Sequence, residues 1–142
     1  MKEFFLILFF SKTVLLTPNP IMLNGEIQLI PKDPLEAITT GASIQIDVSS
    51  MIKQGEDEGF LEFDKRLLES FPAGAINAKL IGNDKTEVML TYEGASLTNK
   101  ESTMLSLYSE GGVPTDIEFN KVVVTSNIEL KDIKIYWKNF KH

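Results

Sequence analysis

Apolar and polar residues alternate in seven short segments of the chain, and this period of two is typical of β-strands that bury one face. In the segment 43–48, Ile44 and Ile46 are expected to face a core, while Gln45 faces away from it. The same alternation recurs in the segments 26–30, 76–81, 86–92, 103–108, 116–125 and 128–140. The pattern therefore predicts a mainly β domain of about seven to eight short strands.

Turn-forming residues separate these segments and indicate antiparallel neighbours. Residues 82–85, Gly-Asn-Asp-Lys, give the strongest hairpin signal, and Ser126 with Asn127 predicts a second turn. In the segment 128–140 the apolar positions change phase near Lys131, which is what a β-bulge produces. The regular exchange of strands and helices that a parallel sheet needs is missing, so we expect an antiparallel β-sandwich or jelly roll.

The segment 60–71 has the one convincing helical period in the sequence. Its apolar residues recur at spacings of three, four and one, which place them on one face of a helix. These residues are Phe60, Phe63, Leu67, Leu68 and Phe71. Pro72 ends the helix, and about three turns are too few for stability alone, so tertiary packing must hold it.

The beginning of the chain is its most apolar part and allows three interpretations. The stretch from Phe4 to Leu16, interrupted by Lys12, gives about 20 Å of helix against the ~30 Å that a membrane anchor spans. A secretory signal is the second interpretation, although no small-residue cleavage site follows. The third is a buried strand of the domain itself, because Phe, Ile and Val favour strands.

Pro18 and Pro20 mark a boundary after this stretch, because each proline removes a backbone donor and biases the preceding residue away from helix. We therefore divide the chain into a hydrophobic N-terminal segment, residues 1–17, and a single β domain, residues 18–142. A signal or an anchor predicts a periplasmic or membrane-associated bacterial protein. A core strand predicts a cytoplasmic one.

The composition excludes several classes of protein. The chain has no cysteine, so neither disulfides nor thiolate metal sites can form. Its formal net charge of −6 repels phosphate backbones, so no nucleic-acid partner is expected. Arg66 is the one arginine, which makes bidentate recognition of carboxylates or phosphates scarce.

The chain also lacks the residue types of most catalytic sites. Its one histidine, His142, is the last residue, and no phosphate-binding or dinucleotide motif occurs. Ser50 and Lys53 match the S-x-x-K pattern of serine acyltransferases, but the companion motifs are missing. Asp116 and Glu118 share a strand face, which is not the opposed geometry of a glycosidase. We therefore expect a protein that is not an enzyme and has no cofactor.

Two kinds of candidate ligand surface remain. The loops 54–59 and 83–84 carry the oxygen ligands that calcium prefers, but neither matches the EF-hand pattern, so we expect exposed loops and no metal. Tyr108 and Tyr136 oppose the core positions of their strands and should point outward. If the two rings are adjacent, they present a flat apolar surface with polar tips on which a sugar can stack.

The sequence thus predicts a non-catalytic binding domain, exported or held at a membrane, whose ligand is a protein partner or a glycan. The alternative is a cytosolic structural subunit of an assembly, in which the N-terminal segment is a core strand and exposed edges pair with neighbours. A carboxylate-based hydrolase is a more distant alternative.

Overall fold

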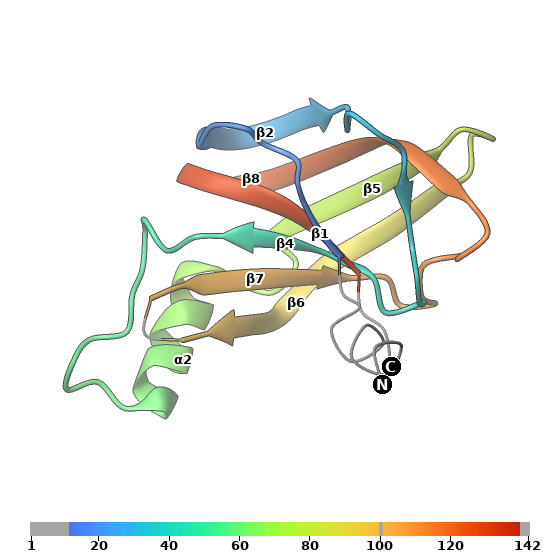
Figure 1. The fold of residues 1–142 in the computed structure, drawn as a ribbon. Coiled ribbons are helices and arrows are strands. Elements are labelled where there is room, and N and C mark those ends of the chain that lie inside the picture. The colour runs from blue at the N-terminus through green and yellow to red at the C-terminus, as the bar shows by residue number, and fades with distance from the viewer. Residues whose placement is uncertain (1–11, 100, 140–142) are drawn as a thin grey trace, which may run out of the picture.

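The computed structural model describes residues 12–99 and 101–139, and Figure 1 shows their arrangement. Eight strands and one helix form within these residues. Their bounds are β1 Lys12–Leu15, β2 Ile21–Leu29, β3 Leu35–Glu36, β4 Ser43–Asp47, α2 Phe60–Ser70, β5 Ile76–Gly82, β6 Glu87–Thr98, β7 Thr103–Tyr108 and β8 Glu118–Asn139.

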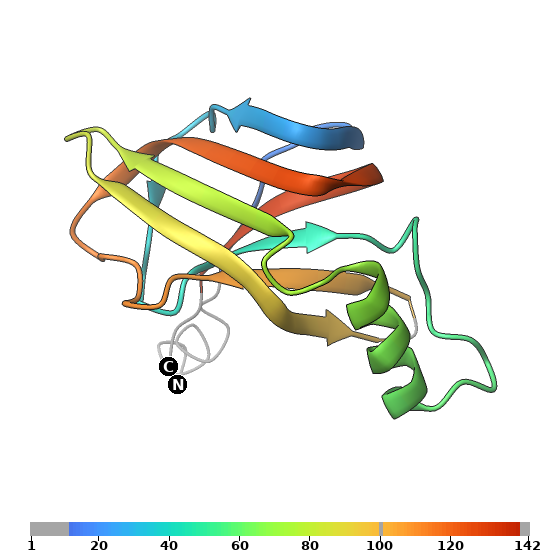
Figure 2. The ribbon, with the colours of Figure 1, turned by 180° about the vertical axis from the view of Figure 1, so that it is seen from behind.

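The strand pairings are antiparallel, and they close the sheet into a barrel. β4 pairs with β7, β7 with β6 and β6 with β5, and both ends of this series, β4 and β5, pair with β8. Five strands therefore form a closed ring of hydrogen bonds (Figures 1 and 2). Closure uses up the edges of these strands, which is one way in which β proteins avoid edge-to-edge association.

β8 closes the barrel because it is long and bent. Its residues 119–126 pair with β5 and its residues 134–138 pair with β4. Between these two parts, Asp132 has a φ of 50° and the register of β2 against β8 shifts. A residue with positive φ beside a register shift is a β-bulge, which bends a strand and increases its twist. The phase change that the sequence shows near Lys131 therefore corresponds to the bend.

Residues 12–36 follow β8 along its other edge. β1, β2 and β3 pair in turn with the last, middle and first parts of β8. Tyr136 pairs with Leu15 of β1 and with Gln45 of β4, so β1 and β4 lie on opposite edges of β8. The segment between β2 and β4 crosses the side of the barrel opposite α2, as Figures 1 and 2 both show.

The sandwich or jelly roll expected from the sequence is not the architecture of these strands. The prediction of a mainly β, antiparallel fold is confirmed, but the sheet closes into a barrel instead of separating into two facing sheets. The turn expected at Ser126 and Asn127 does not form, and β8 continues through both residues. The Asn127 amide donates to the Ala75 carbonyl at 3.0 Å. The backbone of β8 is thus hydrogen-bonded to the residue before β5 at the position where a turn was expected.

The inward faces of the barrel strands form one hydrophobic core. Ile44 and Ile46 are fully buried, as the alternation predicts. Phe119 and Trp137, near opposite ends of β8, lie in contact inside the core with ring centroids 6.5 Å apart. The contact shows how far β8 bends, because 18 residues of an extended strand would otherwise hold these rings roughly 60 Å apart.

The helix forms where the sequence predicts it, but its buried face is narrower. α2 lies at one end of the barrel, beside the end of β6 and the start of β7 (Figure 2). Phe63, Leu67 and Phe71 are buried, whereas Phe60 is 66% and Leu68 39% exposed. The expectation that Phe60 and Leu68 share the buried face of the helix is therefore wrong. Phe60 shares the buried line but is the first residue of the helix, while Leu68 lies about 100° around the helix from Leu67.

Part of the apolar N-terminal stretch pairs with β8 at the edge of the sheet. β1 pairs with the end of β8, and the Leu16 amide donates to the Ile135 carbonyl at 2.8 Å. Thr17 follows, and its Oγ1 accepts a bond of 3.0 Å from the Ile135 amide. Residues 12–15 thus form a strand at the edge of β8, but Thr13 and Leu15 are exposed, so these residues do not form a buried strand. The rest of that stretch lies outside the described residues.

Leu15 and Leu16 are adjacent positions that test this placement of β1. We expect Leu16→Asp to lower the free energy of unfolding by about 3 kcal/mol, because Leu16 is 9% exposed and a carboxylate there would enter the core. Leu15→Asp should lower it by less than about 1 kcal/mol, because Leu15 is 42% exposed. Urea unfolding followed by circular dichroism measures both changes. Equal losses at the two positions would contradict the alternation of this segment.

Candidate functional site

The structure forms a pocket where β1, the segment 30–38 and the end of β8 meet. Its volume is about 640 Å³, within the range of roughly 300–1,000 Å³ that is usual for ligand sites. Its walls are mainly aliphatic side chains and prolines, among them Val14, Leu16, Pro18, Pro31, Pro34 and Ile38. The pocket is therefore suited to apolar groups.

Proline explains why this part of the chain is shaped as it is. Pro31 and Pro34 interrupt the pairing of residues 12–36 with β8 between β2 and β3, because neither has an N–H to donate. The intervening loop leaves the sheet and forms one wall of the pocket. Since a proline ring fixes φ, this wall is held in shape before any ligand arrives.

The pocket also has apolar groups that reach solvent. Leu15 and Ile30 both line it, and they are 42% and 68% exposed. Large apolar side chains in contact with water next to a concave site are typical of binding surfaces. The pocket and these two residues therefore form one continuous apolar surface, which we call the β1–β3 pocket.

Trp137 forms part of the wall of the β1–β3 pocket. Its indole is 1% exposed, and Nε1 has no hydrogen-bond partner within the part of the chain that the structure describes. A buried donor without a partner costs free energy, and most buried polar groups have one. Trp137 is also the one tryptophan of the sequence, so the tryptophan fluorescence of the protein comes from a single position at the pocket wall.

Asn139 fixes the segment beyond β3 to the end of β8. Its Oδ1 accepts a bond of 2.9 Å from the Ile38 amide, and its Nδ2 donates to the Glu36 carbonyl at 2.7 Å. The side chain is 2% exposed and lines the pocket. Because its amide already bonds to the backbone through both ends, its part in the pocket is to hold two walls together.

Charged residues lie at the same pocket. Lys32, Asp33 and Glu36 line it, and all three are exposed. Glu36 is directly opposite Glu118 in the pairing of β3 with β8. The hydrogen bond between the two carboxyl groups, with smaller contributions from burial and from the charge of Glu36, raises the pKa of Glu118 above 4.5. Two carboxylates in contact repel each other when both are ionised.

The pair gives a prediction about stability and pH. Because the pKa of Glu118 is raised in the folded state, the folded chain binds more protons than the unfolded chain just above pH 4.5. The free energy of unfolding should therefore fall as the pH rises through that range. Glu118→Gln removes this loss, so the variant should gain stability relative to the natural protein between about pH 4 and about pH 7. Urea unfolding at both pH values measures the gain.

Asp116→Asn is the matched control, since Asp116 is an exposed carboxylate two residues away. Asp116→Asn removes the same charge, yet it leaves the contact between Glu36 and Glu118 in place. An equal gain in both variants would show that net charge, and not the carboxylate pair, causes the effect.

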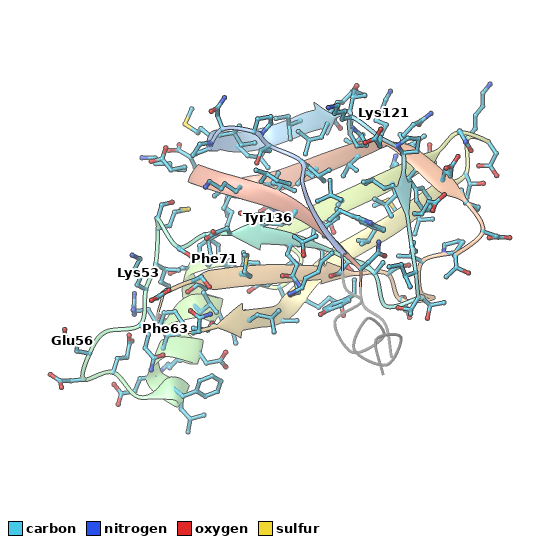
Figure 3. All side chains as sticks on the ribbon, in the orientation of Figure 1. Lys53, Glu56, Phe63, Phe71, Lys121 and Tyr136 are labelled. Carbon is cyan, nitrogen blue, oxygen red and sulfur yellow. The ribbon has the colours of Figure 1, made fainter. Side chains whose placement is uncertain are left out.

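Tyr108 and Tyr136 point outward as predicted, but they are not adjacent. Both lie on the face of the barrel opposite the core positions of β7 and β8, and Figure 3 shows Tyr136 beside β4. Tyr136 pairs with Gln45 of β4, and Gln45 pairs with Ser106 of β7, so one strand separates the two rings. The adjacency on which the flat platform depends is therefore not met.

Small polar side chains occupy the space between the two tyrosines. Ser43, Gln45 and Ser106 are at most 2% exposed, although they lie on the outward face. Ser43 Oγ, Gln45 Nε2 and Ser106 Oγ have no hydrogen-bond partner within residues 12–99 and 101–139. Since these atoms are covered, a ligand resting on the tyrosines would not reach them in this arrangement.

The loop 54–59 is organised by an ion pair. Glu58 accepts bonds from Arg66 Nε at 3.0 Å and Nη2 at 2.8 Å, and from the Gly55 amide at 2.9 Å. The bonds from Arg66, followed by that from Gly55, lower the pKa of Glu58 from 4.5 to about 2. Figure 3 shows Glu56 at the outer end of this loop. The part of the chain that the structure describes contains no group of three acidic or histidine side chains that could hold a metal ion.

The S-x-x-K residues serve the fold. Ser50 Oγ lies 2.9 Å from the carbonyl oxygens of both Lys131 and Asp132, so it binds the bulge of β8. The Lys53 carbonyl accepts a bond of 2.6 Å from Arg66 Nη2. Both residues are exposed, and their described bonds are to backbone or to the ion-paired arginine. The structure therefore gives them a structural role.

Sequence reasoning missed the β1–β3 pocket. Pro31 and Pro34 indicate a break between strands, but a local break does not reveal what it encloses. The signal in the sequence was the placement of Leu15 and Ile30 beside Pro18 and Pro31, four apolar residues next to chain breaks. Only the bend of β8 brings these two stretches to one site.

No protein-family model, curated protein or solved structure matches this chain. Among the residues that the structure describes, no helix has both the length and the hydrophobicity needed to cross a membrane. The interpretation of the site therefore depends on its geometry and chemistry.

Proposed function

We propose that this protein is a non-catalytic binding domain and that the β1–β3 pocket is its ligand site. The observation that carries the proposal is a pocket of about 640 Å³ with mainly aliphatic and proline walls, which joins exposed Leu15 and Ile30. Preformed apolar cavities with a few polar groups are the commonest form of ligand site.

A protein partner fits this pocket better than a glycan does. Sugars need several hydrogen-bonding side chains around them, and the Asn139 amide in the pocket is already bonded to the Ile38 and Glu36 backbones. Apolar side chains of a partner bury most favourably in a cavity that excludes water. The glycan alternative depends instead on Tyr108 and Tyr136, which one strand separates.

The hydrolase alternative has less support. Glu36 and Glu118 are the acidic pair nearest the pocket, but their carboxyl groups are hydrogen-bonded to each other and exposed. The acids of a glycosidase are held about 5–10 Å apart on two sides of a cleft. The pair thus favours a role in charge recognition over a role in bond cleavage.

The pocket can be tested with N-phenyl-1-naphthylamine, a neutral apolar fluorophore that accepts energy from tryptophan. We expect saturable transfer from Trp137, because this one tryptophan lines the pocket. Ile30→Glu should weaken binding by about tenfold or more, since it places a charge at the pocket. Met22→Glu is the matched control, because Met22 is also 68% exposed and does not line the pocket. Equal weakening by both variants, or unsaturable transfer, would contradict the assignment.

We propose a location in the periplasm or at a bacterial membrane surface together with this function. The support is the apolar run between Phe4 and Phe10, which precedes β1 in the sequence. The competing proposal is a cytosolic subunit of an assembly, and the pairing of residues 12–15 with β8 favours it for those residues.

Cell fractionation separates the two proposals. We expect the protein in the periplasmic or membrane fraction, with mass spectrometry of the recovered chain defining its first residue. Intact chain recovered from the cytosol alone would contradict export. The result would not affect the pocket, which is tested by the fluorophore.

A further inference from the structure

The charges at the β1–β3 pocket are unbalanced, and this imbalance bears on what the pocket binds. Among the residues that the structure describes, Asp33 and Glu36 line it together with one cation, Lys32. Glu118 adds a third carboxyl group, because it is hydrogen-bonded to Glu36. The whole chain also carries a formal net charge of −6. An approaching anion is therefore repelled and an approaching cation attracted.

The contact between Glu36 and Glu118 strengthens this preference. Two carboxyl groups directly opposite each other on paired strands are unfavourable when both are ionised. Asn83 Nδ2 lies 3.5 Å from Glu118 Oε1, the outer limit for a hydrogen bond, so it compensates the charge weakly. A cationic group placed beside Glu36 would relieve the repulsion as well as form its own ion pair.

We infer that the occupant of the β1–β3 pocket is a segment of a partner protein in which an apolar side chain has a lysine or arginine beside it. The apolar side chain enters among Val14, Leu16 and Ile38, and the basic side chain meets Asp33 and Glu36. This inference depends on the proposed function, because it specifies the ligand of the same pocket. An anionic amphiphile, such as a fatty acid, matches the apolar walls but not the charge.

Peptide competition against the bound fluorophore tests the inference. Three blocked pentapeptides serve as probes: leucine at the central positions with lysine at both ends, the same leucines with glutamate at both ends, and serines with lysine at both ends. We expect the leucine–lysine peptide to displace N-phenyl-1-naphthylamine at about tenfold lower concentration than the leucine–glutamate peptide. The serine peptide should displace none, because it has no apolar side chain to bury.

A double charge reversal, Asp33→Lys with Glu36→Lys, should invert the order of the two leucine peptides. Asp57→Lys with Glu101→Lys is the matched control, since these acidic residues are also exposed and do not line the pocket. The control should keep the natural preference. For the natural protein, added salt should reduce the difference between the displacing concentrations of the two leucine peptides. This measurement tests the electrostatic contribution without any variant.

The outcomes distinguish this inference from the proposed function. Equal displacement by the two leucine peptides, or displacement by the serine peptide, overturns the inference while the apolar site stands. Failure of all three peptides against a fluorophore that does bind overturns the peptide as occupant and again leaves the apolar site. If the fluorophore itself does not bind at Trp137, the proposed function fails and the inference fails with it.

Discussion

The pairing of β8 along its whole length is the constraint on which the rest of this structure depends. One edge of β8 pairs with β5 and β4, and the other edge pairs with β3, β2 and β1. Backbone groups buried without partners are costly, so a strand of this length must find neighbours on both edges. The bulge at Asp132 makes this possible, because it bends the strand enough for β4 and β5 to belong to one closed series.

The same bend creates the candidate site. Residues 12–36 have to follow β8 around the curve, and they do so in three pieces separated by proline-containing breaks. The first piece, β1, and the last, β3, are thereby brought to the two ends of one strand whose ends lie close together. Asn139 fixes this approach through two hydrogen bonds to the backbone near β3. The pocket is the space that remains between β1, β3 and the end of β8, and the proline-containing loops form part of its walls.

The chemistry around the pocket favours recognition over reaction. Its aliphatic walls offer burial, its polar amide is bonded to backbone, and its exposed carboxyl group on Glu36 contacts that of Glu118 outside the pocket. Under the proposed function, such a site would distinguish ligands by shape and charge. The proposed pairing of an apolar and a basic side chain uses both properties, and it gives the carboxyl contact between Glu36 and Glu118 a role that the fold alone does not explain.

Much of the fold was determined by the sequence itself. Alternation placed Ile44 and Ile46 in the core, the four residues 82–85 formed the expected hairpin, and the phase change near Lys131 marked the bulge. Local chemistry decides these features, because the period of a strand and the torsion angles of a turn depend on neighbouring residues. The helix at 60–70 followed for the same reason, although its buried line was narrower than its apolar face.

The tertiary structure decided what depends on distant pairs. Ser126 and Asn127 read as a turn, yet β8 passes through them because partners far away in the sequence hold it extended. Tyr108 and Tyr136 are outward on their own strands, but the insertion of β4 between their strands keeps them apart. The pocket joins residues near 15, 33 and 138, and no local pattern encodes that meeting. Local periodicity thus determined the elements, and long-range strand pairing determined the barrel and its site.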